Sequence, residues 1–254
     1  MTAAPTSTPP TTSVDLWPIG NCQVSALVDR AGRFVWGCLP RVDGDPAFCS
    51  LLDDKPPAGE DAFGFWEIDI DSKRETTQRY LRNTPILVTR HEDDRGNAIE
   101  VIDFCPRFAR NGRKYRPVAY VRIVRPVAGN PRVRVRLRPA TNWGERLAQT
   151  TRGSNHIRYL LDNGVMRLST TAPVGWIEDE RMFRVERPLY FFLGPDESFA
   201  DDIGMSLENM LDRTIEEWQY WSRSLATPHE WQEAVIRSAI TPGTCNPIEM
   251  SPVT

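Results

Sequence analysis

Groups of neighbouring carboxylates are the residues in this chain whose types and spacing could do chemistry. Two carboxyl groups can act as general acid and general base when their surroundings separate their pKa values. Most of these groups fall in predicted turns or on the polar face of a predicted strand, where solvation explains them, so we expect no catalytic pair. The groups are Asp43/Asp45, Asp53/Asp54, Asp69/Asp71, Asp93/Asp94, Glu178/Asp179/Glu180 and Asp201/Asp202.

Four arginines, at positions 132, 134, 136 and 138, alternate with Val133, Val135 and Leu137. A period of two places the four guanidinium groups on one face of a strand. Such a row could contact phosphate or nucleic acid, but no aromatic residues interleave with it as a single-strand groove requires. The formal net charge is -3. We therefore expect the row to pair with neighbouring acids, and we expect no nucleic-acid partner.

The sequence contains no pattern typical of a metal-binding or cofactor-binding site. His91, His156 and His229 are scattered, and the sequence holds no phosphate-binding glycine loop and no Ser-His-Asp pattern. The sequence predicts neither a metal site nor a cofactor. The eight tryptophans could stack on sugars, and Trp143 and Trp176 lie in loop-like surroundings, but packing is the favoured interpretation.

Five cysteines, an odd number without a C-x-x-C pair, argue against both a disulfide framework and a zinc site. Residues 1–13 are rich in Pro, Thr, Ser and Ala and lack the basic and apolar regions of a signal peptide, so we expect a disordered lead-in and a cytoplasmic protein. No run approaches the ~18–20 apolar residues of a membrane span, and we expect no membrane partner. The cysteines should be free thiols, at least three of them buried.

Residues 14–203 show strand periodicity broken by turn signals, which predicts a mainly β fold, an antiparallel β-sandwich. The Asn163-Gly164 step predicts a hairpin between 156–161 and 165–170. Hairpins are also expected between 84–91 and 98–104, and between 118–125 and 131–139. Residues 182–194 form a last apolar run.

After Gly204 the period becomes helical, which predicts a short helical linker over 204–241. One apolar stripe contains Trp218 and Trp221, and a second stripe begins at Trp231 and includes Ile236. Pro242-Gly243 is expected to break the second helix, leaving an irregular tail over 242–254.

The segment from Ile19 to Asp53 resembles the opening of bacterial glycoside hydrolase family fifteen proteins, the glucoamylases and trehalase-like enzymes. The shared pattern combines residue type, order and spacing over about 35 positions, and a second match near the end covers Trp231, Ala234-Val235 and Arg237-Ser238-Ala239. The matching positions of the first segment are Ile19, Gly20, Cys22, Ala26-Leu27-Val28, Gly32, Val35, Trp36, Cys38, Pro40-Arg41, Asp43, Phe48 and Leu51-Leu52-Asp53.

The resemblance covers only the family's N-terminal portion and implies hydrolysis of α-glucosides or trehalose for the whole enzyme. The family's acid and base glutamates belong to an (α/α)₆ barrel, which needs several hundred residues and has no counterpart here. The resemblance implies that Arg41 and Asp43 lie on a loop that approaches the barrel or the sugar. An Arg–Asp pair that only holds the loop in shape is the favoured interpretation. The resemblance likewise implies a barrel interface, which we assign to Trp218, Trp221, Trp231 and Ile236.

We therefore expect a truncated, non-catalytic N-terminal domain that reaches carbohydrate only through a missing or separate barrel. Apolar helix surface without that barrel predicts self-association. The alternative is a stand-alone carbohydrate-binding or protein-interaction module, and a third option is assembly with a barrel on another chain.

Overall fold

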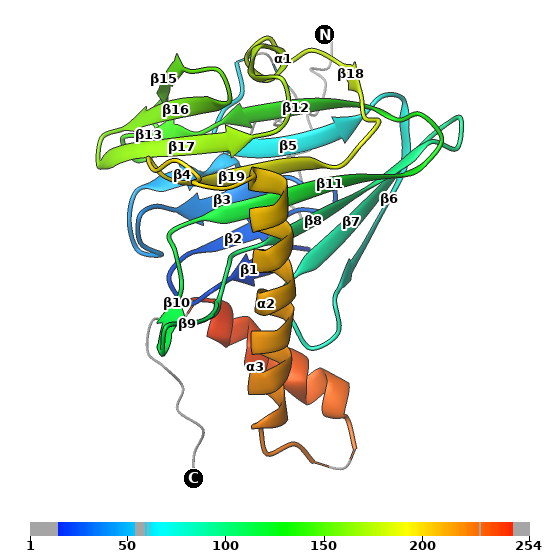
Figure 1. The fold of residues 1–254 in the computed structure, drawn as a ribbon, viewed down its shortest axis with the longest axis vertical. Helices are drawn as coiled ribbons and strands as arrows, with labels where there is room; N and C mark the ends of the chain where they lie inside the picture. Colours follow the sequence, from blue (N-terminus) through cyan, green and yellow to red (C-terminus); the bar gives the residue numbers. More distant parts are fainter. Residues whose placement is uncertain (1–14, 54–58, 60, 229, 246–254) are drawn as a thin grey trace, which may run out of the picture.

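A computed structural model describes residues 15–53, 59, 61–228 and 230–245 of the chain. Two antiparallel sheets form its two main layers (Figure 1). The first sheet contains β1 (Trp17–Gly20), β2 (Ser25–Val28), β3 (Phe34–Cys38), β4 (Pro46–Phe48), β5 (Phe65–Ile70), β12 (Arg132–Arg138) and β18 (Phe183–Arg184).

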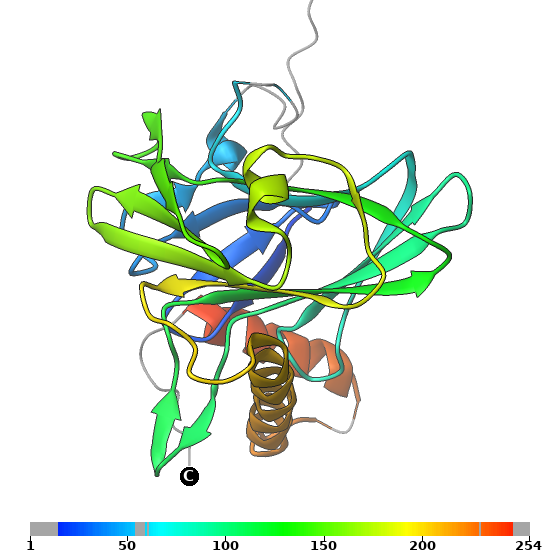
Figure 2. The ribbon, with the colours of Figure 1, turned by 45° about the horizontal axis from the view of Figure 1, so that its top comes forward.

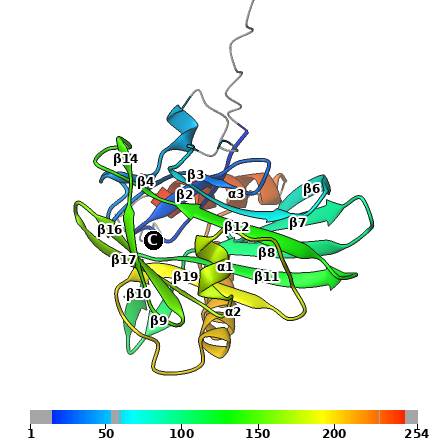
Figure 3. The same cartoon turned by 90° about the horizontal axis from the view of Figure 1, so that it is seen from above.

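The second sheet has eight strands, and two short hairpins lie outside both sheets. In spatial order, the second sheet runs β15 (Gln149–Arg152), β16 (His156–Leu161), β17 (Gly164–Thr170), β19 (Leu189–Pro195), β11 (Tyr120–Ala128), β8 (Ala98–Phe104), β7 (Leu87–Asp93) and β6 (Lys73–Tyr80). The hairpins pair β9 (Phe108–Arg110) with β10 (Arg113–Tyr115), and β13 (Ala140–Thr141) with β14 (Arg146–Leu147). A 3₁₀ turn occupies Ser50–Leu52, and α1 (Val174–Glu178) lies above the layers (Figure 3).

The main core lies between the two sheets, which confirms the mainly antiparallel β fold. The ring of Phe34 stands edge-on to Phe48, Trp66 and Tyr120, with centroids 5.4–5.8 Å apart. Arg122 crosses this core and donates to both carboxylate oxygens of Asp103 at 2.8 and 3.0 Å. Its guanidinium group also lies 4.4 Å from the ring of Phe34. Burial of this charge is tolerated because an acid, carbonyl groups and aromatic faces surround it.

Two of the three expected hairpins are present. β7 pairs with β8, and β16 pairs with β17 around Asn163-Gly164. The third expectation is wrong: β11 pairs with β8 and β19, whereas β12 pairs with β5 and β18 in the other sheet. The link between β11 and β12 therefore crosses from one layer to the other. Gly129, with φ of 63°, turns the chain there.

The apolar run 182–194 also divides between the layers. β18 joins the first sheet and β19 the second, with the exposed residues 186–188 between them. Alternation along a strand reports which face is buried but not which sheet the strand joins, so one apolar run can serve both layers.

The helical part consists of α2 (Ile203–Arg223) and α3 (Gln232–Cys245), which confirms a short C-terminal helical segment. Asp202 caps α2 by accepting from the N–H of Met205 at 2.8 Å. α2 runs along the outer face of the second sheet (Figure 1). The side chains of Leu207 and Leu211 are buried in the cluster between this helix and the sheet. No helix in the described part of the chain is long and apolar enough to cross a membrane.

α3 differs from expectation at both ends. It begins at Gln232, after Trp231, and it continues through Pro242 to Cys245 rather than breaking at Pro242-Gly243. A proline in the last turn of a helix removes one hydrogen bond, and contacts with β1 hold this turn in place. The expected lead-in, residues 1–13, and most of the expected tail, residues 246–254, lie outside the described residues.

Candidate functional site

The turn after β1 receives the end of α3. Gly20 must be glycine because a Cβ there would press on the carbonyl oxygen of Thr244. The backbone N–H of Cys22 donates to that same oxygen at 3.1 Å, and the thiol of Cys22 donates to the carbonyl of Gly243. The last carbonyls of a helix have no partner within the helix, so this turn acts as an external cap for α3.

Asn21 fixes the turn from the other side. Its buried amide nitrogen donates to the carbonyls of Pro106 and Pro117, both at 2.9 Å, and its side-chain oxygen accepts from the N–H groups of Gln23 and Val24. The Ile19-Gly20-Asn21-Cys22 pattern therefore joins the first hairpin, the strands after β8 and α3. Its role in this chain is structural.

A charged cluster completes the junction between the helices and the sheets. The Arg107 guanidinium group lies 4.4 Å from the ring of Trp218 and donates to the Cys22 sulfur at 2.9 Å. Glu217 of α2 forms an ion pair with Lys114 and lies 4.0 Å from Arg107. The ring of Trp218 also stands edge-on to Trp221, with centroids 5.4 Å apart.

The four residues assigned to a barrel interface occupy very different surroundings. Trp218 is fully buried within this chain and Trp221 is half-buried beside it, so neither forms an open surface. Trp231 is 79% exposed, and Ile236 is half-buried. An interface with a second domain at this place remains a prediction, and Trp231 is the residue with most free surface to serve it.

The loop after β3 carries Arg41 and Asp43, which form a two-pronged ion pair at 2.8 and 2.9 Å. The hydrogen bond from Arg41 holds the pKa of Asp43 below its ordinary value. Both side chains are largely exposed. Asp45 of the same loop accepts from the N–H of Trp143 at 2.8 Å, and so joins this loop to the β13–β14 turn. The loop is braced, with its charges facing solvent.

The acidic groups that the sequence singled out interact with other parts of the chain. Most are held by a basic side chain or a backbone amide; Arg152, for example, donates to Glu178 at 2.8 Å. Asp54 lies outside the described residues. A general acid needs a raised pKa, and burial does raise the pKa of Asp103, against the opposing effect of Arg122. Asp103, however, is fully enclosed in the core, where no substrate reaches it.

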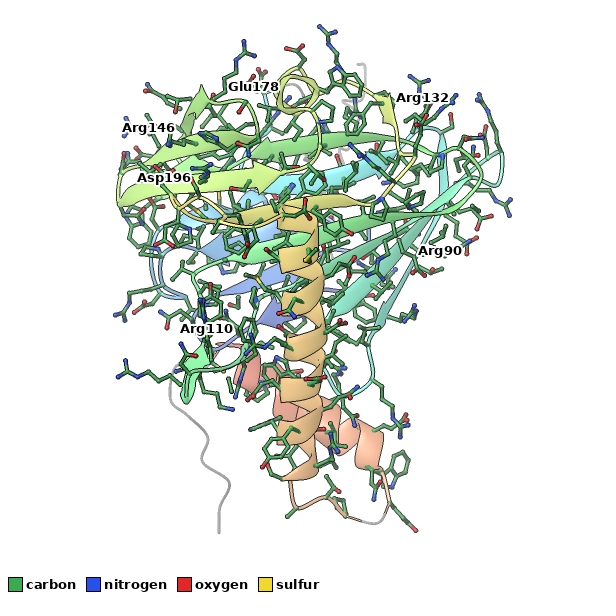
Figure 4. The ribbon with its side chains drawn as sticks, in the orientation of Figure 1. Arg90, Arg110, Arg132, Arg146, Glu178 and Asp196 are labelled. Atoms are coloured by element: carbon green, nitrogen blue, oxygen red, sulfur yellow. The ribbon has the colours of Figure 1, made fainter. Side chains whose placement is uncertain are left out.

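The arginine row pairs with acids, as the sequence predicted. β12 lies antiparallel to β5, which sets Arg134 opposite Asp69 and Arg136 opposite Glu67. The first and last arginines of the row pair with acids that do not lie directly opposite them. Arg132 pairs with Asp71, and Arg138 donates to Glu180 of the segment after α1. Figure 4 shows Arg132 and Glu178 at the upper edge of the molecule. The row is thus neutralised by the chain itself.

The cysteines and potential metal ligands fit a structural role. Cys22, Cys38 and Cys105 are buried, as expected, and the side chain of Cys245 lies outside the described residues. Burial, with help from Asp53 and Asp45, raises the pKa of the partly buried Cys49 to about 11, which favours the protonated thiol at neutral pH. The described residues hold no group of three or more His, Cys, Asp or Glu side chains suited to a metal.

The family model described as "Trehalase-like, N-terminal" matches residues 11–181, well over half of the chain. A comparison with curated proteins found no match. The match covers the turn that caps α3, the braced loop and the arginine row. The chain belongs to the family of trehalase-like N-terminal domains.

Proposed function

We propose that this chain is the non-catalytic N-terminal domain of a hydrolase that acts on trehalose or related α-glucosides. The observation that carries the proposal is the family match over residues 11–181. The pairing of its surface carboxylates with arginines supports a structural role, because a carboxylate held by an arginine is a poor general acid. Catalysis then belongs to a helical barrel domain, on the same polypeptide or on another.

The domain's contribution is to position that barrel. α2 and α3 are anchored to the sheets by Cys22, Arg107 and Trp218, so they present a fixed surface. We assign contact with the barrel to Trp231 and Ile236, at the start of α3. We assign Arg41 and Asp43 to the side that approaches the barrel or its sugar. We place the protein in the cytoplasm, where a thiol such as that of the buried Cys38 stays reduced.

Activity measurements test the proposal. The purified chain, incubated with trehalose, maltose and soluble starch, should release no glucose above a blank. Turnover that disappears when an acidic residue of this chain is replaced would overturn the non-catalytic assignment. Each acidic variant must keep the melting temperature of the parent, so that loss of activity is not loss of fold.

Assembly is tested with a separately produced (α/α)₆ barrel domain from a trehalase-like enzyme. The two should co-elute in gel filtration, and the mixture should release more glucose from trehalose than the barrel alone. Trp231→Ser should weaken co-elution. The matched control is Trp143→Ser, because Trp143 is 71% exposed at a different place in the fold. Equal weakening by both variants would count against an interface at Trp231.

A stand-alone carbohydrate-binding module is the second candidate function. The observation that favours it is Trp143, a largely exposed ring on a turn that Asp45 fixes. Exposed rings held on rigid backbone can stack on sugars at small entropic cost. Under this alternative, Trp143→Ala abolishes sugar binding, and the chain gains nothing from a barrel partner.

A further inference from the structure

A cavity of about 570 Å³ lies on the outer side of the second sheet, between the β9–β10 hairpin, residues 195–201 and the first half of α2. Figure 2 shows the hairpin projecting from the sandwich beside this helix. Small-molecule sites have volumes of about 300–1,000 Å³ and combine apolar walls with a few polar groups. This cavity has the volume and the mixed lining of such a site.

Aromatic rings form one wall. Phe108 of β9 and Tyr115 of β10 lie 5.0 Å apart between centroids, inclined by 36°. Phe108 is buried and braced by the Arg213 guanidinium group, 4.1 Å from its ring, whereas Tyr115 is half-buried. The Arg110 guanidinium group lies 5.5 Å from the centroid of the Tyr115 ring. A ligand that packs against the partly open ring of Tyr115 therefore also meets a charged hydrogen-bond donor.

Hydrogen-bonding groups also line the cavity. Ser206 and Asn209 project from α2, and Glu197 from the segment after β19. Their side chains make no hydrogen bond within the described part of the chain. Burial raises the pKa of the Tyr115 hydroxyl, while Arg110 opposes the rise. That hydroxyl stays neutral at pH 7, so it can both donate and accept.

The charges around the cavity balance. Arg110 and Arg213 carry positive charge, and Glu197 and Asp201 carry negative charge. A site of this kind offers no net attraction to an anion or a cation. It offers an aromatic face for the C–H side of a ring, together with charged and neutral partners for several hydroxyl groups. A neutral, polyhydroxylated ring matches both properties.

We propose that this cavity binds a neutral saccharide, with one sugar ring against Tyr115 and its hydroxyl groups bonded to Asn209, Glu197 and Arg110. Arg110 lies on the hairpin, where Figure 4 labels it. The site requires neither a barrel nor any catalytic residue, so it stands independently of the proposed function. The cavity would let this domain hold carbohydrate at a place separate from the active site of the barrel.

Saturation-transfer difference NMR on the purified chain, with a titration to obtain Kd, tests the site. Trehalose and maltose are the probes, and glucose 6-phosphate and glucosamine are the charged comparators. We expect the neutral sugars to bind at least as tightly as either charged sugar. Asn209→Ala should weaken binding roughly threefold to tenfold, the usual effect of one lost hydrogen bond. Tyr115→Ala should weaken it at least as much.

Tyr220→Ala is the matched control, because it removes an aromatic ring that is 71% exposed and lies outside the cavity, and it should leave Kd unchanged. Tyr115→Phe keeps the ring and should retain more affinity than Tyr115→Ala. Undetectable binding of both neutral sugars would overturn the proposal. So would binding that survives Asn209→Ala and Tyr115→Ala, or binding lost in Tyr220→Ala. The folded fraction of each variant is measured first, and Kd values are compared only between variants that are folded to the same extent as the parent. Because no barrel is present, failure here leaves the assembly test unaffected.

Discussion

The backbone N–H of Cys22 bonds to the carbonyl oxygen of Thr244 at 3.1 Å, so a turn near the start of the chain caps the final helix. Capping from a distant segment couples the position of α3 to the first hairpin. Thr244 is itself almost fully buried. The glycine, the bonded amide and the thiol of this turn are accounted for by packing around one helix end.

Replacing Gly20 by Ala should loosen α3. The added Cβ would press on the carbonyl of Thr244 and on that of Val24, and backbone atoms cannot move aside as a flexible side chain can. Overpacking of this kind costs about 1–3 kcal/mol. We expect a lower urea midpoint and faster amide hydrogen exchange in α3 than in the parent.

Gly175→Ala is the matched control, because nothing lies within 4 Å of its Cβ position. It should change neither the midpoint nor the exchange of α3. If Gly20→Ala behaved like Gly175→Ala, the contact between the turn and the helix would not hold α3 in solution.

His91 should make stability depend on pH. Burial lowers its pKa to about 3, assisted by Lys73 and opposed by Asp69. Between about pH 3 and the ordinary value of 6.5, the unfolded chain binds a proton that the folded chain does not. Stability is therefore retained above pH 6.5 and lost as pH falls, by about 1.4 kcal/mol per pH unit well below 6.5. His91→Gln should flatten this slope in urea unfolding measured from pH 7 to 4.5.

The control for this slope is His156→Gln. His156 is only partly buried, so water hydrates its charged form, and the change in slope should be smaller. An unchanged pH profile in His91→Gln would mean that His91 accepts a proton in the folded protein.

Trp218 should contribute far more to stability than its neighbour Tyr220. Trp218 is fully buried against Trp221 and Arg107, whereas Tyr220 is 71% exposed. Trp218→Ala should cost about 3–5 kcal/mol of unfolding free energy. Tyr220→Ala should stay within about 0.5 kcal/mol of the parent. Denaturant unfolding of the two variants checks this, and similar losses would contradict the packing of α2.

Local patterns predicted the parts of the fold whose partners are near in sequence. The Asn163-Gly164 turn and the β7–β8 hairpin follow from alternation and turn residues. β6 was not expected, because Lys73–Tyr80 is an edge strand with mostly exposed, polar side chains and carries no alternating apolar signal. The crossing between β11 and β12 also escaped prediction, since pairing in either sheet satisfies the same alternation.

The candidate sites, like the strands, were predictable where their residues are near in sequence and not where the residues come from distant segments. The Arg41–Asp43 pair and the neutralised arginine row follow from charges that are close in sequence or on adjacent strands. The cavity beside Tyr115 does not, because Tyr115, Glu197 and Asn209 come from three distant segments. The helical period places Trp218 and Trp231 on apolar stripes, but it does not distinguish their surroundings. Trp218 is buried by α2, whereas Trp231 lies just before α3, with a backbone φ of 63°.

Trp231 should promote self-association, as the exposed helical stripe first suggested. Its side chain is 79% exposed, whereas Ile236, one turn into α3, is half-buried. Removing an exposed aromatic residue takes away surface that drives association without removing contacts within the fold. Trp231→Ser should therefore lower the apparent mass in concentrated solution, measured by sedimentation, and leave the melting temperature unchanged. Ile236→Ser should instead lower stability by about 1 kcal/mol, because part of its side chain is buried. A parent chain that stays monomeric at high concentration and binds no hydrophobic dye would contradict the association and would favour the stand-alone module.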